Sequence, residues 1–209
     1  VGLSYYSQPL AVSQFNAWCL ASDSPGNCNE ELHELMLFGV APEPLQDAGK
    51  GLWAVSTSFS VASLLFDALN SSTWGWRFLA KGSDGKVGVA WDKTIISGHS
   101  QGAGHAAYMS YRLQMAAVFV SGPQDCGLCS QAWLKEMQRQ RHVLRRALFS
   151  KHEECGPEPL APTSFCEKNL MMRNLLQMGF DVPFSTWDGK TKIQNLSNAV
   201  VISEGRPTC

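Results

Sequence analysis

The stretch Lys93–Gly122 reads KTIISGHSQGAGHAAYMSYRLQMAAVFVSG, and it decides the fold class. It begins with a short apolar run rich in β-branched residues, Thr94–Ile96, and ends with a second apolar run, Ala116–Val120. Both runs are typical of strands that are buried on both faces of a sheet. A tight turn and a segment of small, helix-forming residues lie between them. Strand, turn, helix and strand in this order predict a βαβ unit, which joins parallel strands.

The turn after the first strand reads Gly98-His99-Ser100-Gln101-Gly102 and matches G-x-S-x-G, the pattern of a nucleophile elbow. Such a turn holds a serine in a strained conformation above the sheet, so we expect Ser100 to be a nucleophile. We expect glycine to be required at 98 and 102, because side chains there would collide with the neighbouring helix and strand. The backbone N–H of Gln101, at the helix N-terminus, is the predicted oxyanion donor.

The longer string GHSQGAGHAAY, with SGPQD after the next strand, resembles the α/β-hydrolase superfamily and within it the BPSS-like serine hydrolases, a microbial-type subgroup. The resemblance is strongest over Trp91–Asp125. It implies an α/β fold with a doubly wound, mostly parallel sheet and helices on both faces. It also implies an esterase- or lipase-like serine hydrolase that acts on ester or related acyl bonds of a small-molecule substrate. No metal and no organic cofactor is implied.

Three acidic residues are candidates for the acid of a catalytic triad. Asp125 follows the second strand, and open α/β sheets bind ligands at the carboxyl ends of their strands. Glu154, with Glu153 beside it, follows the predicted strand Leu144–Phe149, after which the acid commonly lies in hydrolases of this type. Acidic residues in a loop are ordinarily just solvated, so the choice among the three stays open.

The histidine that a serine mechanism requires is absent from its expected place. In this fold it follows the last strand, predicted here at Ala199–Ser203, and the residues from there to Cys209 contain none. His99 and His105 are expected to serve packing or polar contacts. His152 would need an unusual arrangement to reach hydrogen-bond distance of the nucleophile.

The front of the chain shows no glycine-rich loop for a second oxyanion donor. We therefore expect one domain over residues 1–209 that is truncated at both ends, with its catalytic histidine beyond the last residue. The alternative is a non-catalytic binding protein that kept the hydrolase fold without a complete triad. A C-x-x-C redox protein, based on Cys126 and Cys129, is a third hypothesis.

Composition excludes several classes. The chain has 17 basic and 18 acidic residues among 209, which gives no field that would attract nucleic acid. No apolar run approaches the roughly 18 residues of a membrane span. Seven cysteines and two N-glycosylation sequons, at Asn70 and Asn195, favour loop disulfides and a secreted or lumenal setting, without excluding the cytoplasm.

The rest of the chain alternates predicted helices with loops. His33 lies on the flank of a predicted helix and is expected at the surface, because no second metal ligand stands at helical spacing. Trp74 and Trp76 are expected to pack under their loop, with the lining of a substrate pocket as the alternative. The predicted polar loop is Gln14–Asn29, a further strand is predicted at Phe180–Thr186, and helices are predicted at Glu30–Phe38, Leu52–Asn70, Gln131–Val143 and Phe165–Met178.

Overall fold

The computed structural model describes Gly2 and residues 25–39, 60–123, 132–150, 167–181, 185–187 and 200–203. The chain divides into two compact units, Val1–Thr94 and Ile95–Cys209, and each is described by itself. The expectation of one domain over the whole chain stays a prediction.

Within the described part of the second unit, five strands form one sheet. Every neighbouring pair of strands in it is parallel. In spatial order the strands are β3 (Ile95–His99), β4 (Ala116–Val120), β5 (Arg145–Ser150), β7 (Val200–Ser203) and β6 (Ser185–Trp187). Helix α5 (Gln101–Leu113) connects β3 to β4. The predicted βαβ unit is confirmed, and the unit is an α/β structure with a parallel sheet.

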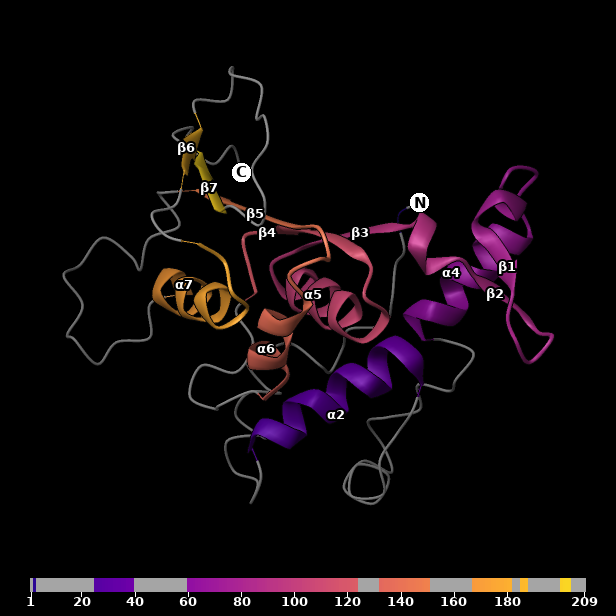
Figure 1. Ribbon diagram of the computed structural model, residues 1–209, viewed down its shortest axis with the longest axis horizontal. Helices are drawn as coiled ribbons and strands as arrows, with labels where there is room; N and C mark the ends of the chain where they lie inside the picture. The colour runs from indigo at the N-terminus through magenta and orange to yellow at the C-terminus, as the bar shows by residue number, and fades with distance from the viewer. Residues whose placement is uncertain are drawn as a thin grey trace. The chain divides into compact units, whose positions relative to one another are not determined.

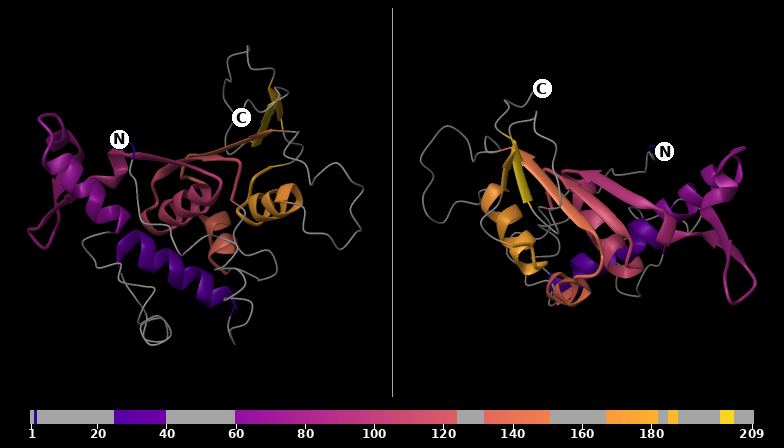
Figure 2. Two further views of the ribbon diagram at one scale, coloured as in Figure 1. Left: turned by 180° about the vertical axis from the view of Figure 1, so that it is seen from behind. Right: turned by 45° about the horizontal axis from the view of Figure 1, so that its top comes forward.

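Helices α5, α6 (Ala132–Met137) and α7 (Glu167–Gln177) lie on the same side of strands β3, β4 and β5 (Figure 1). Figure 2 shows the same arrangement from two further directions. Consecutive right-handed crossovers in one direction along a sheet place their helices on one face, which explains this layer. A second layer of helices is not among the elements described in this unit.

Side-chain burial along the strands alternates, because the described helices cover one face of the sheet (Figure 1). Ala117 and Phe119 on β4 are buried, whereas their neighbours along the strand are half-buried. On β3, Ile95 is 67% exposed. The expectation that this strand is buried on both faces is therefore wrong, since successive side chains point to opposite faces and the described helices cover one of them.

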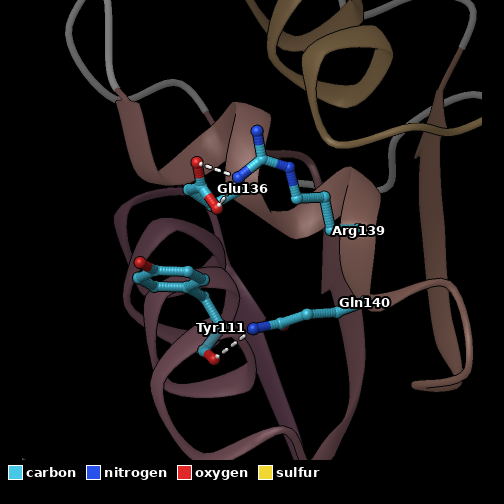
Figure 3. Close-up of polar contacts among 4 residues, drawn as sticks. All are labelled: Tyr111, Glu136, Arg139 and Gln140. Carbon is cyan, nitrogen blue, oxygen red and sulfur yellow. Dashed lines mark hydrogen bonds and ion pairs between the residues drawn. The ribbon is translucent and has the colours of Figure 1, made fainter.

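Helix α5 is the centre of the helical layer. Every residue from Ala103 to Ser110 is buried, and the small side chains in this run allow the helix to lie close to the sheet. Trp133 of α6 packs edge-on against Tyr108 of α5, with ring centroids 5.2 Å apart. Gln140 lies in the 3-10 turn η4 (Gln138–Gln140) that follows α6, and its Nε2 donates to the carbonyl of Tyr111 in α5, 3.2 Å away (Figure 3).

Arg145, the first residue of β5, is a buried hydrogen-bond centre with 1% of its surface exposed. Its Nε donates to Ser110 Oγ at 2.8 Å, and its Nη2 donates to Gln140 Oε1 at 2.7 Å and to the Ser110 carbonyl at 3.2 Å. Burial lowers the pKa of Arg145 to about 10, so the guanidinium is charged at neutral pH. It thereby places a cation at the last turn of α5, where the helix dipole favours positive charge.

The described residues of the first unit form two α-helices and a hairpin. Helix α2 (Pro25–Phe38) contacts α4 (Val61–Asn70), and the hairpin pairs β1 (Leu79–Lys81) with β2 (Val87–Val89). Short 3-10 turns η2 (Gly75–Phe78) and η3 (Trp91–Lys93) flank this hairpin. None of the described helices is long and apolar enough to cross a membrane.

Several expectations for the first unit are corrected. Residues from Pro25 to Asn29 belong to α2 rather than to a loop, since proline is well suited to the first helical position. His33 is buried, with 1% exposed, rather than at the surface. Trp74 and Trp76 are exposed by 48% and 66% rather than packed under a loop, and Arg77 lies 5.5 Å from the Trp76 ring centroid.

The described parts of the remaining predicted elements mostly agree in type. Of the helix expected at Leu52–Asn70 the structure describes α4, and of the strand expected at Phe180–Thr186 it describes β6, with Phe180 and Asp181 outside any strand. The helix expected at Phe165–Met178 is described as α7, and Gly179, with φ +86°, follows it as expected of a helix stop. The helix expected over Gln131–Val143 is shorter: α6 continues only into the 3-10 turn η4 (Gln138–Gln140). Cys28 is buried in α2, while the other six cysteines lie outside the described residues, so disulfide pairing stays a prediction.

Replacing Arg145 by alanine should lower the free energy of unfolding by about 3 kcal/mol, because it removes several charge-assisted hydrogen bonds and leaves their buried acceptors unsatisfied. The matched control is Arg139→Ala. Arg139 pairs with Glu136 at 2.7 Å, but its side chain is 78% exposed. This control should cost at most about 0.5 kcal/mol. Urea unfolding of the two variants checks the prediction, and equal losses would contradict it.

Candidate active site

Ser100 is the one residue between the end of β3 and the start of α5. Its backbone has φ 53° and ψ −120°, a conformation that residues other than glycine rarely adopt. Its N–H donates to the carbonyl of Val120 at 2.9 Å, which attaches the turn to the neighbouring strand. The conformation is the strained one expected of an elbow. The role of Ser100 as a nucleophile stays a prediction.

Gly98 is where the elbow leaves no room for a side chain. A Cβ atom built on it would lie 1.8 Å from the carbonyl oxygen of Gly102 and 2.8 Å from the backbone nitrogen of Ala103. Both contacts are with backbone, which cannot rotate away as a side chain can. The expected requirement for glycine at position 98 is confirmed.

Gly102 differs from Gly98. A Cβ atom at this position would meet nothing within 4 Å. The expectation that glycine is required here for space is therefore wrong, because this position in the first turn of α5 faces open space rather than the strand.

The first turn of α5 begins with Gln101. The N–H groups at the start of a helix point out of its end, where the helix dipole is positive, and they suit a developing anion. One of them is already engaged, since the Ala103 N–H donates to the Ser100 carbonyl at 2.9 Å. The position of Gln101 agrees with an oxyanion donor, and that role stays a prediction.

The end of the neighbouring strand packs against the elbow, which the sequence did not reveal. A Cβ atom on Gly122 would lie 2.5 Å from the Ala103 Cβ and 2.9 Å from the Ser100 carbonyl oxygen. Ser121, just before it, has φ 52°, and its N–H donates to the Leu148 carbonyl at 2.9 Å. The string SGPQD after this strand is already singled out by the sequence, and the structure adds that Gly122 packs against the elbow.

Helix α7 also supports this segment. Asn174 is 1% exposed, and its Nδ2 donates to the carbonyl of Pro123 at 3.2 Å. The bond is buried. The chain that leaves β4 is thus fixed by β5, by α5 and by α7.

The described histidines of this unit lie in three different places. His99 is exposed at the end of β3, and His105 is buried within α5. His142 is exposed, with its Nε2 3.3 Å from Gln114 Oε1. It precedes β5, so it belongs to the edge of the parallel sheet opposite to the elbow. His152 lies outside the described residues.

The predicted acids Asp125, Glu153 and Glu154 also lie outside the described residues, so the structure does not place them relative to Ser100. Within the described part of the chain, no group of three or more His, Cys, Asp and Glu side chains is arranged to hold a metal ion.

No family model, no curated protein and no solved structure matches this chain. The resemblance to the α/β-hydrolases therefore rests on the residues of the elbow and its flanking segments.

Alanine substitutions at the two glycines should have opposite effects. Gly98→Ala should lower the free energy of unfolding by about 2–3 kcal/mol, because the added methyl group must displace backbone. Gly102→Ala should raise it by up to about 1 kcal/mol, because alanine favours a helix and meets no obstacle here. Thermal or urea unfolding of both variants measures this. A stable Gly98→Ala together with an unstable Gly102→Ala would contradict the elbow geometry.

Proposed function

We propose that this protein is a serine hydrolase that cleaves ester or related acyl bonds of small-molecule substrates, with Ser100 as its nucleophile. We also propose that its second unit is an α/β-hydrolase-type structure. The observation that carries the proposal is the backbone of Ser100, with φ 53° and ψ −120° between a parallel strand and a helix. Strained backbone of this kind persists where the surrounding structure enforces it, and it clusters at active sites.

The surroundings of Ser100 support this function. The strand pairs of the sheet are parallel, so Ser100 stands at the carboxyl edge, where α/β sheets bind ligands. The backbone contact at Gly98 and the hydrogen bond to Val120 fix the turn before any substrate binds. A reacting group held in this way requires little reorganisation during the reaction.

In the proposed reaction the Ser100 hydroxyl attacks the acyl carbon while a general base accepts its proton. The oxygen that becomes negative is stabilised at the start of α5, with the N–H of Gln101 as donor. The acyl–oxygen bond of the ester then breaks, and the leaving alcohol takes the proton from the base. Water, deprotonated by the same base, attacks the acyl-serine, which releases the carboxylic acid and restores the Ser100 hydroxyl. The proposal uses no metal and no organic cofactor, and it assigns the triad acid to Asp125 or Glu154.

A general base must come within hydrogen-bond reach of Ser100. His152 is the histidine of the chain that follows β5, and β5 ends at the same edge of the sheet as β3. The test of the proposed function therefore includes a variant of this residue.

The test is labelling by a fluorophosphonate, which reacts with activated serines. Where the general base is present, within these residues or in a chain extended at its C-terminus to include the expected histidine, the wild-type protein should be labelled and Ser100→Ala should lose the label. Ser97→Ala is the matched control and should keep it, because Ser97 is an exposed serine in the same strand. If His152 is the base, His152→Ala should slow labelling by at least about a hundredfold.

Two results would contradict the proposal. Labelling that persists in a folded Ser100→Ala variant would show that another residue reacts. A folded wild-type chain that is not labelled, even when it is extended at its C-terminus to include the expected histidine, would favour the alternative of a hydrolase-fold binding protein. Circular dichroism of each variant establishes that it is folded.

A further inference from the structure

We propose that Ser121 is the second functional hydroxyl of this site and donates a hydrogen bond to an acceptor oxygen of the bound acyl compound, beside the bond that Ser100 attacks. This inference rests on the proposed function, because it assigns a substrate-binding residue to the same site. It concerns compounds that carry an oxygen acceptor next to the reacting centre, such as carboxylic esters.

The register of the sheet places the two serines side by side. The last paired residues of β3 and β4 are His99 and Val120, and each serine is the next residue on its strand. Neighbouring strands in a sheet lie roughly 4.8 Å apart. The hydrogen bond from the Ser100 N–H to the Val120 carbonyl extends the ladder to this row. The two backbones therefore leave the sheet at adjacent points on one edge.

The two serines also share an unusual backbone conformation. Among the described residues other than glycine, positive φ occurs at Ser100 (53°), Ser121 (52°) and Gln114 (50°). Gln114 caps the C-terminus of α5, where the left-handed conformation is ordinary. The remaining two stand next to each other at the carboxyl edge of the sheet. Glycine would adopt this conformation at position 121 without strain, whereas serine there lowers the free energy of unfolding by about 1 kcal/mol. A functional role of the side chain would explain why serine stands at this position.

The segment that carries Ser121 is held from three sides. Its own N–H donates to Leu148 of β5, Gly122 packs on the backbone of Ser100 and on Ala103, and the Pro123 carbonyl accepts from the buried Asn174. A side chain on such a fixed backbone suits substrate binding, because little freedom is lost when the ligand arrives.

A serine hydroxyl provides one donor and two acceptor lone pairs. Ser121 can therefore keep a contact within the protein and still bind a ligand oxygen. Its N–H is engaged with β5, so the hydroxyl rather than the backbone is the group assigned to the substrate.

Two substitutions separate the hydroxyl from the backbone. Ser121→Ala removes the hydroxyl and keeps the backbone strain, while Ser121→Gly removes the hydroxyl and relieves the strain. If the hydroxyl binds the ligand, both variants should reduce the second-order rate of fluorophosphonate labelling of Ser100 by about three- to tenfold, the worth of one hydrogen bond. The loss should appear as weaker binding of the probe before reaction. Ser97→Ala should leave the rate unchanged.

Ser121→Asn provides the rescue, because asparagine tolerates positive φ and carries an N–H donor. It should restore part of the lost rate. Wild-type labelling kinetics in Ser121→Gly would overturn the inference. If Ser121→Ala were slower while Ser121→Gly was not, the loss would come from backbone strain and not from the missing hydroxyl. Either result with labelling still dependent on Ser100 leaves the proposed function intact. A chain that is not labelled either as given or with a C-terminal extension that includes the expected histidine overturns both.

Discussion

The backbone contact between Gly98 and the carbonyl of Gly102 is the constraint on which the second unit depends. A strand that must reverse into a helix within one residue brings the first helical turn against the last residues of the strand. A Cβ atom on Gly98 would lie 1.8 Å from the Gly102 carbonyl oxygen, so only a hydrogen atom fits there. The reversal forces Ser100 into positive φ and sends α5 back across the sheet. The helix then covers β3 and β4, and its buried small residues follow from that close approach.

The two ends of α5 lie beside different groups: the first turn is next to Ser100, and the last turn binds the guanidinium of Arg145. Its first turn presents N–H groups beside Ser100, at the positive end of the helix dipole. Its last turn meets the buried guanidinium of Arg145, which binds both the carbonyl and the hydroxyl of Ser110. The cation therefore fixes the far end of the helix to β5. A site at one edge of the sheet is in this way supported by a polar network at the other.

The candidate site depends on neighbouring strands more than on one motif. Ser100 comes from the end of β3, and Ser121 and Gly122 come from the end of β4. Only the parallel register brings these ends to one row. The Asn174 bond from α7 shows that a helix late in the chain also supports this edge. Positive φ at Ser100 and Ser121 is energetically unfavourable, and the packing around the two residues enforces it.

The sequence by itself determined the local structure of this region. The apolar run Ala116–Val120 predicted β4 to the residue, and the G-x-S-x-G pattern predicted the strand, elbow and helix, because sterics within a few residues leave one solution. The stop of α7 at Gly179 is local in the same sense. The roles of Ser100, Gln101 and the three acids remain predictions, since they depend on chemistry rather than on backbone shape.

The tertiary structure alone decided what depends on contacts between distant segments. It showed that Gly98 and not Gly102 is required for space, that one face of β3 is open at Ile95, and that His33 is buried. It also brought Ser121 and Gly122 to the elbow. Residue type fixes what a side chain can do and which local conformation it prefers. Burial, register and close approach are instead set by which segments meet, and that is a property of the folded chain as a whole.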